Sequence, residues 1–356
     1  MVPESESRVA PPTRRRITRN TAPQRLLVPD VLRGIAIIAM LIAHASPFVP
    51  NAPGVARFVT ANFSELASPL FALVMGMSAE LVWRQGGRVG KTLLQQTLRG
   101  LFLIVLGVWM AGWGSWVAII LAYLGVLIIL GSPILLARTP AVIAVAAVLL
   151  VASQPLLASA RSWTWMYTAP LPVREILTWV LLGPQYRVVN LLPLFLIGAV
   201  LVRHGFRRDR VLWVLTAVAP LAYLAWAFGE RGGSVESGEY LDTLKDIGLV
   251  SVVYVLVVLA ATARRERAQR FWDVVFIPLR VCGQVALSLY LLHVGLIALW
   301  NNAYGRPVEN LYLGWLVIVP GMILIGWLWW RFVGTGPVEW IMAWLTGRRK
   351  PLRRVS

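Results

Sequence analysis

The stretch from Pro29 to Pro50, PDVLRGIAIIAMLIAHASPFVP, decides the fold of this chain. Its apolar run is long enough to cross a bilayer, since a transmembrane helix needs about 20 apolar residues. Arg33 lies at the start of the run, and His44 lies eleven residues further on, inside it. An ionisable side chain within lipid is energetically costly and is therefore a functional candidate. His44 is accordingly the first candidate for a site.

The composition of the whole chain is typical of a protein that crosses the membrane many times. Of its 356 residues, 58% are apolar and only 14% are charged, and the mean hydropathy is +0.69. Soluble domains carry far more charge. The single cysteine, Cys282, excludes an internal disulfide and any cysteine-rich zinc or iron–sulfur site, because those need several thiolates. The sequence therefore predicts a membrane protein without a bound metal.

The apolar runs predict an all-α, polytopic transmembrane helix bundle of about ten spans. The predicted spans are 31–49, 66–83, 98–112, 114–136, 140–158, 188–202, 211–228, 246–263, 284–300 and 311–333. The third and sixth runs are short, so the positions of their ends are the least defined.

The basic residues predict the orientation of the bundle. The net charge of +18 is spread over short clusters between apolar runs, not over one continuous face, which argues against nucleic-acid binding. Most of these clusters fall on the side of the N-terminus, and cytoplasmic loops carry the excess of Lys and Arg in membrane proteins. We therefore expect both termini in the cytoplasm. Arg far outnumbers Lys, which indicates a GC-rich bacterial genome and hence a bacterial plasma (inner) membrane.

The polar ends of the chain predict tails on one membrane domain. Residues 1–24 and 347–356 are predicted to be basic cytoplasmic tails, the first of them disordered, and residues 25–346 the transmembrane domain. An alternative interpretation makes the first span a signal peptide, since the tripeptide AHA at 43–45 resembles a small-x-small cleavage site. The long leader and an apolar run that continues to Val49 favour a retained span.

A second histidine is predicted to lie at the depth of the first. The stretch LRVCGQVALSLYLLH ends at His293, about ten residues into its span. Both spans run from inside to outside, so at ~1.5 Å rise per residue the two imidazoles are expected to share one layer. Each histidine alone could be a hydrogen-bonded core residue, whereas two at matched depth favour a site. Tyr290 and Asn190, the latter near the outer end of a span kinked by Pro193, offer further polar groups.

Six segments carry a resemblance to a known family. They are D-x-x-R-G at 30–34, PLFALVMGMS, ILAYLGVLIILGSP, NLLPLFLIGAVLVRHG, GQVALSLYLLHV and GPVEWIMAWLTGRRKPLRR. In this order, over about residues 25–350, they resemble the YeiB-like family of bacterial membrane proteins. That family is similar to the acyltransferase-3 and heparan-alpha-glucosaminide acetyltransferase families. The spacing of Arg33, ten residues and His44 is also that of the functionally important arginine–histidine pair of the acyltransferase-3 family.

The resemblance implies a membrane-embedded acyltransferase. Its donor would be cytoplasmic acyl-CoA, with acetyl-CoA as the first choice. Its acceptor would be a hydroxyl or amine of an envelope glycan, a lipid or a small metabolite. The expected partners are therefore the lipid bilayer, acyl-CoA and that acceptor, without nucleic acid, and a homodimer is left open.

The candidate residues suit the chemistry of acyl transfer. Arg33, held by Asp30, would bind a donor phosphate, because a guanidinium pairs bidentately with phosphate oxygens. His44 would act as general base on the acceptor or would carry the acyl group covalently. Three further polar residues would orient His44 or stabilise an oxyanion, namely His293, Tyr290 and Asn190.

Two other classes of function are compatible with the same residues. In a transporter, the buried histidines would relay protons or bind substrate at the midplane, and helices broken at Pro69, Pro193 and Pro320 would suit that role. Against it, the sequence has no internal inverted repeat and few carboxylates within the spans for ion coupling. An inactive scaffold that keeps the fold without the reaction is the third class.

Overall fold

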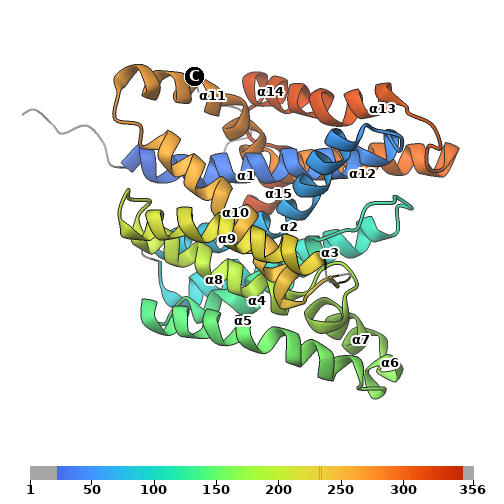
Figure 1. Ribbon diagram of the computed structural model, residues 1–356, viewed down its shortest axis with the longest axis horizontal. Coiled ribbons are helices and arrows are strands. Elements are labelled where there is room, and N and C mark those ends of the chain that lie inside the picture. The colour runs from blue at the N-terminus through green and yellow to red at the C-terminus, as the bar shows by residue number, and fades with distance from the viewer. Residues whose placement is uncertain (1–21, 86, 232, 234, 348–356) are drawn as a thin grey trace, which may run out of the picture.

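The computed structural model describes residues 22–85, 87–231, 233 and 235–347, and its regular structure there is entirely helical (Figure 1). This confirms the predicted all-α fold. The tails predicted at 1–24 and 347–356 lie almost entirely outside the described residues and stay predictions. The first helix, α1, begins at Ala22.

Ten helical segments of the described chain are apolar enough to be membrane spans, eight of them long and two shorter. The long ones are α1 (Ala22–Ala45), α2 (Gly54–Trp83), α3 (Val89–Ala111), α5 (Thr139–Arg161), α9 (Arg210–Glu230), α10 (Tyr240–Ala261), α12 (Ala286–Tyr304), and α13 (Tyr312–Leu316) joined to α14 (Met322–Phe332) through a π-helical turn. The short ones are α4 (Leu121–Ile134) and α8 (Val188–His204). The predicted number of spans is therefore confirmed.

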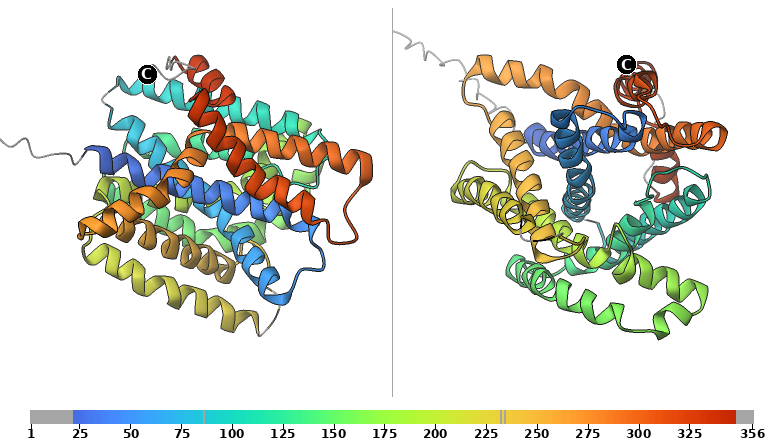
Figure 2. Two further views of the ribbon diagram at one scale, coloured as in Figure 1. Left: turned by 90° about the horizontal axis from the view of Figure 1, so that it is seen from above. Right: turned by 45° about the vertical axis from the view of Figure 1, so that its right-hand side comes forward.

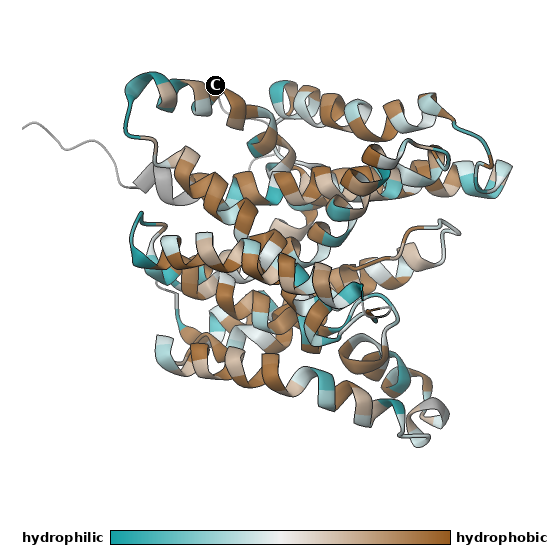
Figure 3. Cartoon of the chain, in the orientation of Figure 1, coloured by the Kyte–Doolittle hydropathy of each residue, from teal (hydrophilic) through white to brown (hydrophobic). Residues whose placement is uncertain are grey.

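The spans surround a core formed by α1 and α2. Both helices are mostly buried and lie in the middle of the bundle when it is viewed obliquely along its length (Figure 2, right). The outer helices α5 and α9 instead expose apolar side chains, such as Val151 at 70% and Leu221 at 65%. Hydrophobic residues dominate the helix bodies and polar residues gather toward their ends (Figure 3). This is the distribution that a bilayer selects, because lipid tails solvate apolar side chains.

Glycines allow the central helices to touch through their backbones. A Cβ added at Gly76 of α2 would lie 1.7 Å from the carbonyl oxygen of Phe195 on α8, and one at Gly198 of α8 would lie 2.0 Å from that of Leu73. Gly34 of α1 is equally close to the backbone of the amphipathic helix α11 (Glu266–Gln284). Small residues at such crossings give membrane helices the close van der Waals contact that drives their association.

The fourth span differs from its predicted extent of 114–136. Helix α4 begins only at Leu121, and residues 112–120 form an irregular segment. Asn301 and Asn302, at the end of α12, donate hydrogen bonds from Nδ2 to the carbonyl oxygens of Gly114 and Trp113 at 2.7 and 2.9 Å. Non-helical backbone at a membrane span needs such partners, and it is tolerated where it lines a cavity.

The connection before α8 is built from short helical pieces. They are α6 (Trp165–Thr168), α7 (Leu171–Leu177) and a π-helical turn (Thr178–Leu182), followed by an irregular run to Arg187. At the far end of the chain, α15 (Pro337–Leu345) contacts α12 and α3. Both regions contribute residues to the cavities described next.

Candidate active site

Two cavities enter the bundle from opposite ends. The first, of about 630 Å³, is lined by Asp30 and Arg33 at the start of α1, and we name it the Arg33 cavity. The second, of about 540 Å³, is lined by His44 at the end of α1, and we name it the His44 cavity. The linings share Phe71, Ile120 and Tyr290. The two cavities are therefore neighbours along the length of α1.

The two membrane histidines are in direct contact. Nδ1 of His44 lies 2.9 Å from Nε2 of His293, and the rings are nearly parallel, with centroids 5.2 Å apart and an interplanar angle of 12°. The prediction that the two imidazoles share one layer is thereby confirmed. His293 is fully buried, whereas His44 is partly accessible from the His44 cavity.

The hydrogen bonds of this pair define which nitrogen carries a proton. Nδ1 of His293 lies 2.9 Å from the carbonyl oxygen of Leu289, which can only accept, so this nitrogen is protonated. In the neutral ring, Nε2 of His293 is then an acceptor, and Nδ1–H of His44 donates to it. The remaining nitrogen, Nε2 of His44, keeps an unshared lone pair. His44 is therefore oriented as a base.

Aromatic residues hold the pair on both sides. Nε1–H of Trp116, in the irregular segment before α4, donates to the carbonyl oxygen of His44 at 3.1 Å. The ring of Tyr290 packs edge-on against His293 with centroids 5.4 Å apart. The hydroxyl of Tyr290 accepts a long hydrogen bond, 3.4 Å, from the backbone N–H of Ile120. The phenolic proton of Tyr290 thus stays available to a ligand at the boundary between the cavities.

Arg33 projects into the other cavity. It donates to Ser78 Oγ at 2.7 Å, to Asp30 Oδ1 at 3.3 Å and, weakly, to the carbonyl oxygen of Gly283 at 3.5 Å. Three hydrogen bonds within the described structure leave part of the five N–H donors of a guanidinium for a ligand. Asp30 therefore holds Arg33, as expected, and both line the same wall.

Asn190 lies apart from the other predicted site residues. Its Nδ2 faces the carbonyl oxygen of Gly238 at 3.5 Å, and the residue is absent from the linings of both cavities. The structure thus groups His44, His293 and Tyr290 at one level, and Arg33 with Asp30 at another.

Two polar residues of the Arg33 cavity carried no recognisable signal in the sequence. Gln96 of α3 is only 2% exposed, and its Nε2 has no hydrogen-bond partner among the described residues. Glu339 of α15 accepts from the backbone N–H groups of Leu287 and Ser288 at 2.6 and 3.1 Å, and from the Ser288 hydroxyl. It therefore caps the start of α12, the helix that carries Tyr290 and His293. Burial raises the pKa of the Glu339 carboxyl, and the hydrogen bonds oppose that shift.

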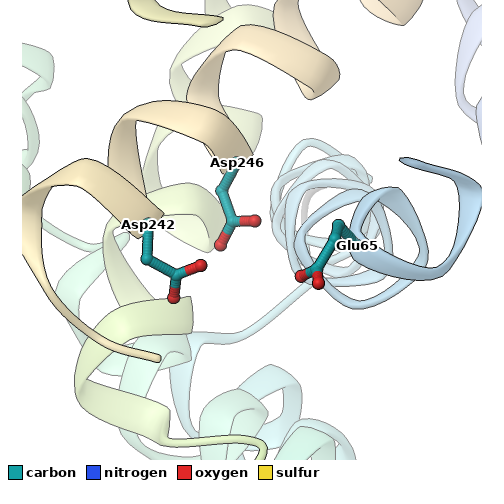
Figure 4. Close-up of side chains that lie close together, drawn as sticks. All are labelled: Glu65, Asp242 and Asp246. Carbon is teal, nitrogen blue, oxygen red and sulfur yellow. The ribbon is translucent and has the colours of Figure 1, made fainter. Parts of the chain in front are cut away.

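Three carboxylates gather beside the His44 cavity (Figure 4). Glu65 of α2 faces Asp242 and Asp246 of α10, and their oxygens lie within 4.8 Å of one another. Lys245 Nζ lies 3.6 Å from Glu65 and 4.2 Å from the ring centroid of Trp226. One ammonium thus faces three carboxyl groups, so the local charge is negative. The geometry could hold a cation, but the prediction that the enzyme needs no metal is not tested by it.

A tyrosine closes the same side of the His44 cavity. Tyr186, just before α8, lines it and packs edge-on against Tyr123 of α4 with centroids 5.7 Å apart. Burial, and secondarily the nearby Glu65, raises the pKa of Tyr186 to about 12. Its hydroxyl is therefore a neutral hydrogen-bonding group at physiological pH.

Comparison with known proteins assigns this architecture to a family. No curated protein sequence matches the chain. The family model of the acyltransferase 3 domain, described as an acyltransferase domain, matches residues 27–331. This range contains the α1 and α12 residues that line the two cavities, such as Arg33, His44 and Tyr290, and also His293. The chain therefore belongs to the acyltransferase 3 family and is a multi-pass membrane acyltransferase.

Proposed function

We propose that the protein transfers an acyl group, with acetyl as the first choice, from acyl-CoA in the Arg33 cavity to an acceptor in the His44 cavity. The acceptor would be a hydroxyl or amine of an envelope glycan, a lipid or a small metabolite. One observation carries the proposal: two successive hydrogen bonds link the carbonyl oxygen of Leu289 to His293, and His293 to His44. They leave Nε2 of His44 free to act as a base beside the boundary of the two cavities.

The Arg33 cavity suits an anionic donor with amide groups. Arg33 offers guanidinium N–H groups to phosphate oxygens. The buried Nε2 of Gln96 would be satisfied by a carbonyl of the donor arm, since an unsatisfied buried donor costs about 1–3 kcal/mol. The α2–α3 connection, which adds Gln85 to the cavity wall, also carries exposed Arg84 and Arg88. These cations would attract the phosphates to the mouth.

The transfer step follows from the protonation state of the pair. Nε2 of His44 removes the proton of the acceptor hydroxyl as its oxygen attacks the thioester carbonyl carbon. The phenolic hydroxyl of Tyr290 donates to the carbonyl oxygen as it becomes an oxyanion. When the carbon–sulfur bond breaks, His44 returns the proton to the CoA thiolate, giving an ester and free CoA. In the alternative route, Nε2 of His44 attacks the thioester carbon, the carbon–sulfur bond breaks and CoA thiolate leaves, so His44 carries the acyl group covalently. The acceptor hydroxyl then attacks that acyl carbon, the carbon–nitrogen bond breaks, and the hydroxyl proton goes to the CoA thiolate.

A pair of histidine variants tests the assignment. His44→Ala removes the base and should lower the rate of acyl transfer by about 10²- to 10⁴-fold. His204→Ala is the matched control, because His204 pairs with Asp209 at 2.8 Å, away from both cavities. The assay follows CoA release from acetyl-CoA by purified protein with a thiol reagent, and acylated product by mass spectrometry. A His44→Ala protein as active as wild type would overturn the proposal, as would substrate flux into proteoliposomes without covalent change.

In the proposed orientation, the Arg33 cavity opens to the cytoplasm of a bacterium and the His44 cavity opens to the outer side of the plasma membrane. Gly90, in the first turn of helix α3, and Gly233, between α9 and α10, are exposed glycines with open space for an added side chain. Cys282, the natural cysteine, is buried. In intact cells, Gly233→Cys should react with a membrane-impermeant maleimide, whereas Gly90→Cys should react only after lysis. The reverse pattern would exclude cytoplasmic acyl-CoA as the donor for the Arg33 cavity.

The transmembrane unit, its narrower family likeness and its association in the bilayer are also proposals. The transmembrane unit would span 25–346 with basic cytoplasmic tails at 1–24 and 347–356. The narrower likeness to the YeiB-like family rests on the segments quoted from the sequence. A homodimer in the bilayer would use the exposed apolar side chains of α5 and α9.

A further inference from the structure

Four chain segments pass from one cavity to the other at the same level. On α1, Ile37 lines the Arg33 cavity and Met40 lines the His44 cavity. On α2, on the segment that precedes α4 and on α12, one residue each belongs to both linings, namely Phe71, Ile120 and Tyr290. These three shared residues form a septum across the bundle.

The septum lies next to the histidine pair, and two of its three side chains are buried. Ile120 and Tyr290 are 4% and 3% exposed, and the N–H of Ile120 donates to the Tyr290 hydroxyl. The Tyr290 ring also contacts His293. Phe71 faces both cavities, and no hydrogen bond of its side chain holds it there, since it has no polar atom. Truncating Phe71 would therefore open the septum without breaking a hydrogen bond.

The septum lies on the path of the acyl group. On the proposed function, the donor binds through Arg33 in one cavity, whereas the base, His44, lines only the other. The thioester carbon must therefore reach the level of Phe71 and Tyr290 before an acceptor can attack it. The acyl chain points ahead of that carbon, so it must enter or cross the septum.

The far side of the septum does not favour a hydrocarbon chain. The wall of the His44 cavity that α2 and α10 supply carries Ser64, Glu65, Ser68, Asp242 and Lys245. Charged and hydroxyl groups are well hydrated, and a hydrocarbon chain laid against them would displace that water without gaining an apolar contact. A long acyl chain that crossed the septum would therefore have to lie against these hydrated groups, although other parts of the wall, such as Met40 and Val117, are apolar.

We infer that the septum of Phe71, Ile120 and Tyr290 selects the acyl group by length, and that Phe71 is the specificity-determining residue. The inference rests on the proposed function and deepens it. Short groups such as acetyl fit at the level of the histidines, and each methylene that the septum cannot hold lowers kcat/KM. A pocket discriminates by roughly 10- to 200-fold for one methylene.

The test compares donors of increasing length on matched phenylalanine variants. Purified wild-type protein, Phe71→Ala and Phe71→Trp are assayed for CoA release from acetyl-, butyryl-, hexanoyl- and octanoyl-CoA. Phe58→Ala is the control, because Phe58 lies on the same helix with its side chain 61% exposed. We expect wild type and Phe58→Ala to prefer acetyl-CoA. Phe71→Ala should raise the octanoyl-to-acetyl ratio of kcat/KM by at least about tenfold, and Phe71→Trp should lower the butyryl-to-acetyl ratio.

The outcomes separate this inference from the function on which it rests. The role of the septum is overturned if the wild-type protein uses all donors equally. It is also overturned if the kcat/KM ratios between donors are unchanged in both Phe71 variants. Either result leaves the proposal of acyl transfer intact. A folded wild-type protein that releases CoA from no donor overturns the proposed function and the septum with it. If Phe71→Ala does not fold, the Phe71→Trp ratio and a Phe71→Leu variant, expected to be intermediate, decide the question.

Discussion

Replacing His293 tests whether this residue acts by orienting His44. In the wild type, Nε2 of His293 accepts the Nδ1–H of His44 at 2.9 Å, deep in the bundle. His293→Leu fills a similar volume but leaves that N–H without an acceptor. His293→Gln places an amide oxygen near the former position of Nε2 and can accept the same proton. The two variants thus differ mainly in one hydrogen bond.

The size of the effect follows from that bond. An unsatisfied buried donor costs about 1–3 kcal/mol. His44 can avoid the unsatisfied N–H by turning its ring or by moving the proton to Nε2. The same free energy therefore disfavours the orientation and tautomer in which His44 is reactive. Each 1.36 kcal/mol is a factor of ten in rate, so kcat for His293→Leu should fall by roughly 5- to 150-fold. His293→Gln should recover most of the loss.

The assay is CoA release from acetyl-CoA at saturating acceptor, with KM measured in parallel. His293 is absent from the lining of the Arg33 cavity, so KM for the donor should change by less than about twofold in either variant. Thermal unfolding of both variants controls for misfolding. Wild-type kcat in His293→Leu would refute the orienting role, and equal losses in the two variants would refute the hydrogen bond as its cause.

Three further predictions concern the donor site and the framework. Gln96→Leu should raise KM for acyl-CoA about 5- to 10-fold with little change in kcat, whereas the exposed Gln269→Leu should change neither. Glu80→Ala leaves the partly buried Arg203 without the carboxylate 3.0 Å away and should destabilise the protein by about 3–5 kcal/mol in chemical denaturation. Replacing both residues with Met should cost less. Burial raises the pKa of Glu339 above its ordinary 4.5, so its ionisation opposes folding. The stability of wild type relative to Glu339→Gln should therefore be highest below pH 4.5 and should fall as pH rises through the raised pKa, as measured by thermal unfolding.

Hydropathy predicted the bundle because each long span buries or exposes one continuous apolar run. It also predicted that two histidines meet, because ionisable residues within apolar runs are few and His44 and His293 lie at matched depth on spans of the same direction. Arg33 and Asp30 were predictable as a pair from their spacing of three residues on one helix face. These features depend on local sequence and on the fixed rise of a helix.

Features that depend on tertiary contacts could not be predicted in this way. The late start of α4 depends on Asn301 and Asn302, which are far along the chain and satisfy the backbone before it. The cap formed by Glu339 on α12 joins residues about fifty positions apart. Glu65 and Asp246 are far apart in the sequence, and only the packing of α2 against α10 brings their carboxyl groups together. Asn190 was a candidate by polarity alone, and its side chain faces a loop.

The distance between the two halves of the site restricts the kind of donor. Arg33 and His44 are eleven residues apart on one helix, which at 1.5 Å per residue separates them by about 16 Å along α1. A donor whose phosphate contacts Arg33 must therefore present its reactive carbon far from that phosphate. An acyl phosphate joins the two groups through a single oxygen and cannot reach both residues. Acyl-CoA carries its thioester on a long, thin arm, so on the proposed function the spacing of Arg33 and His44 favours a thioester donor over a mixed anhydride.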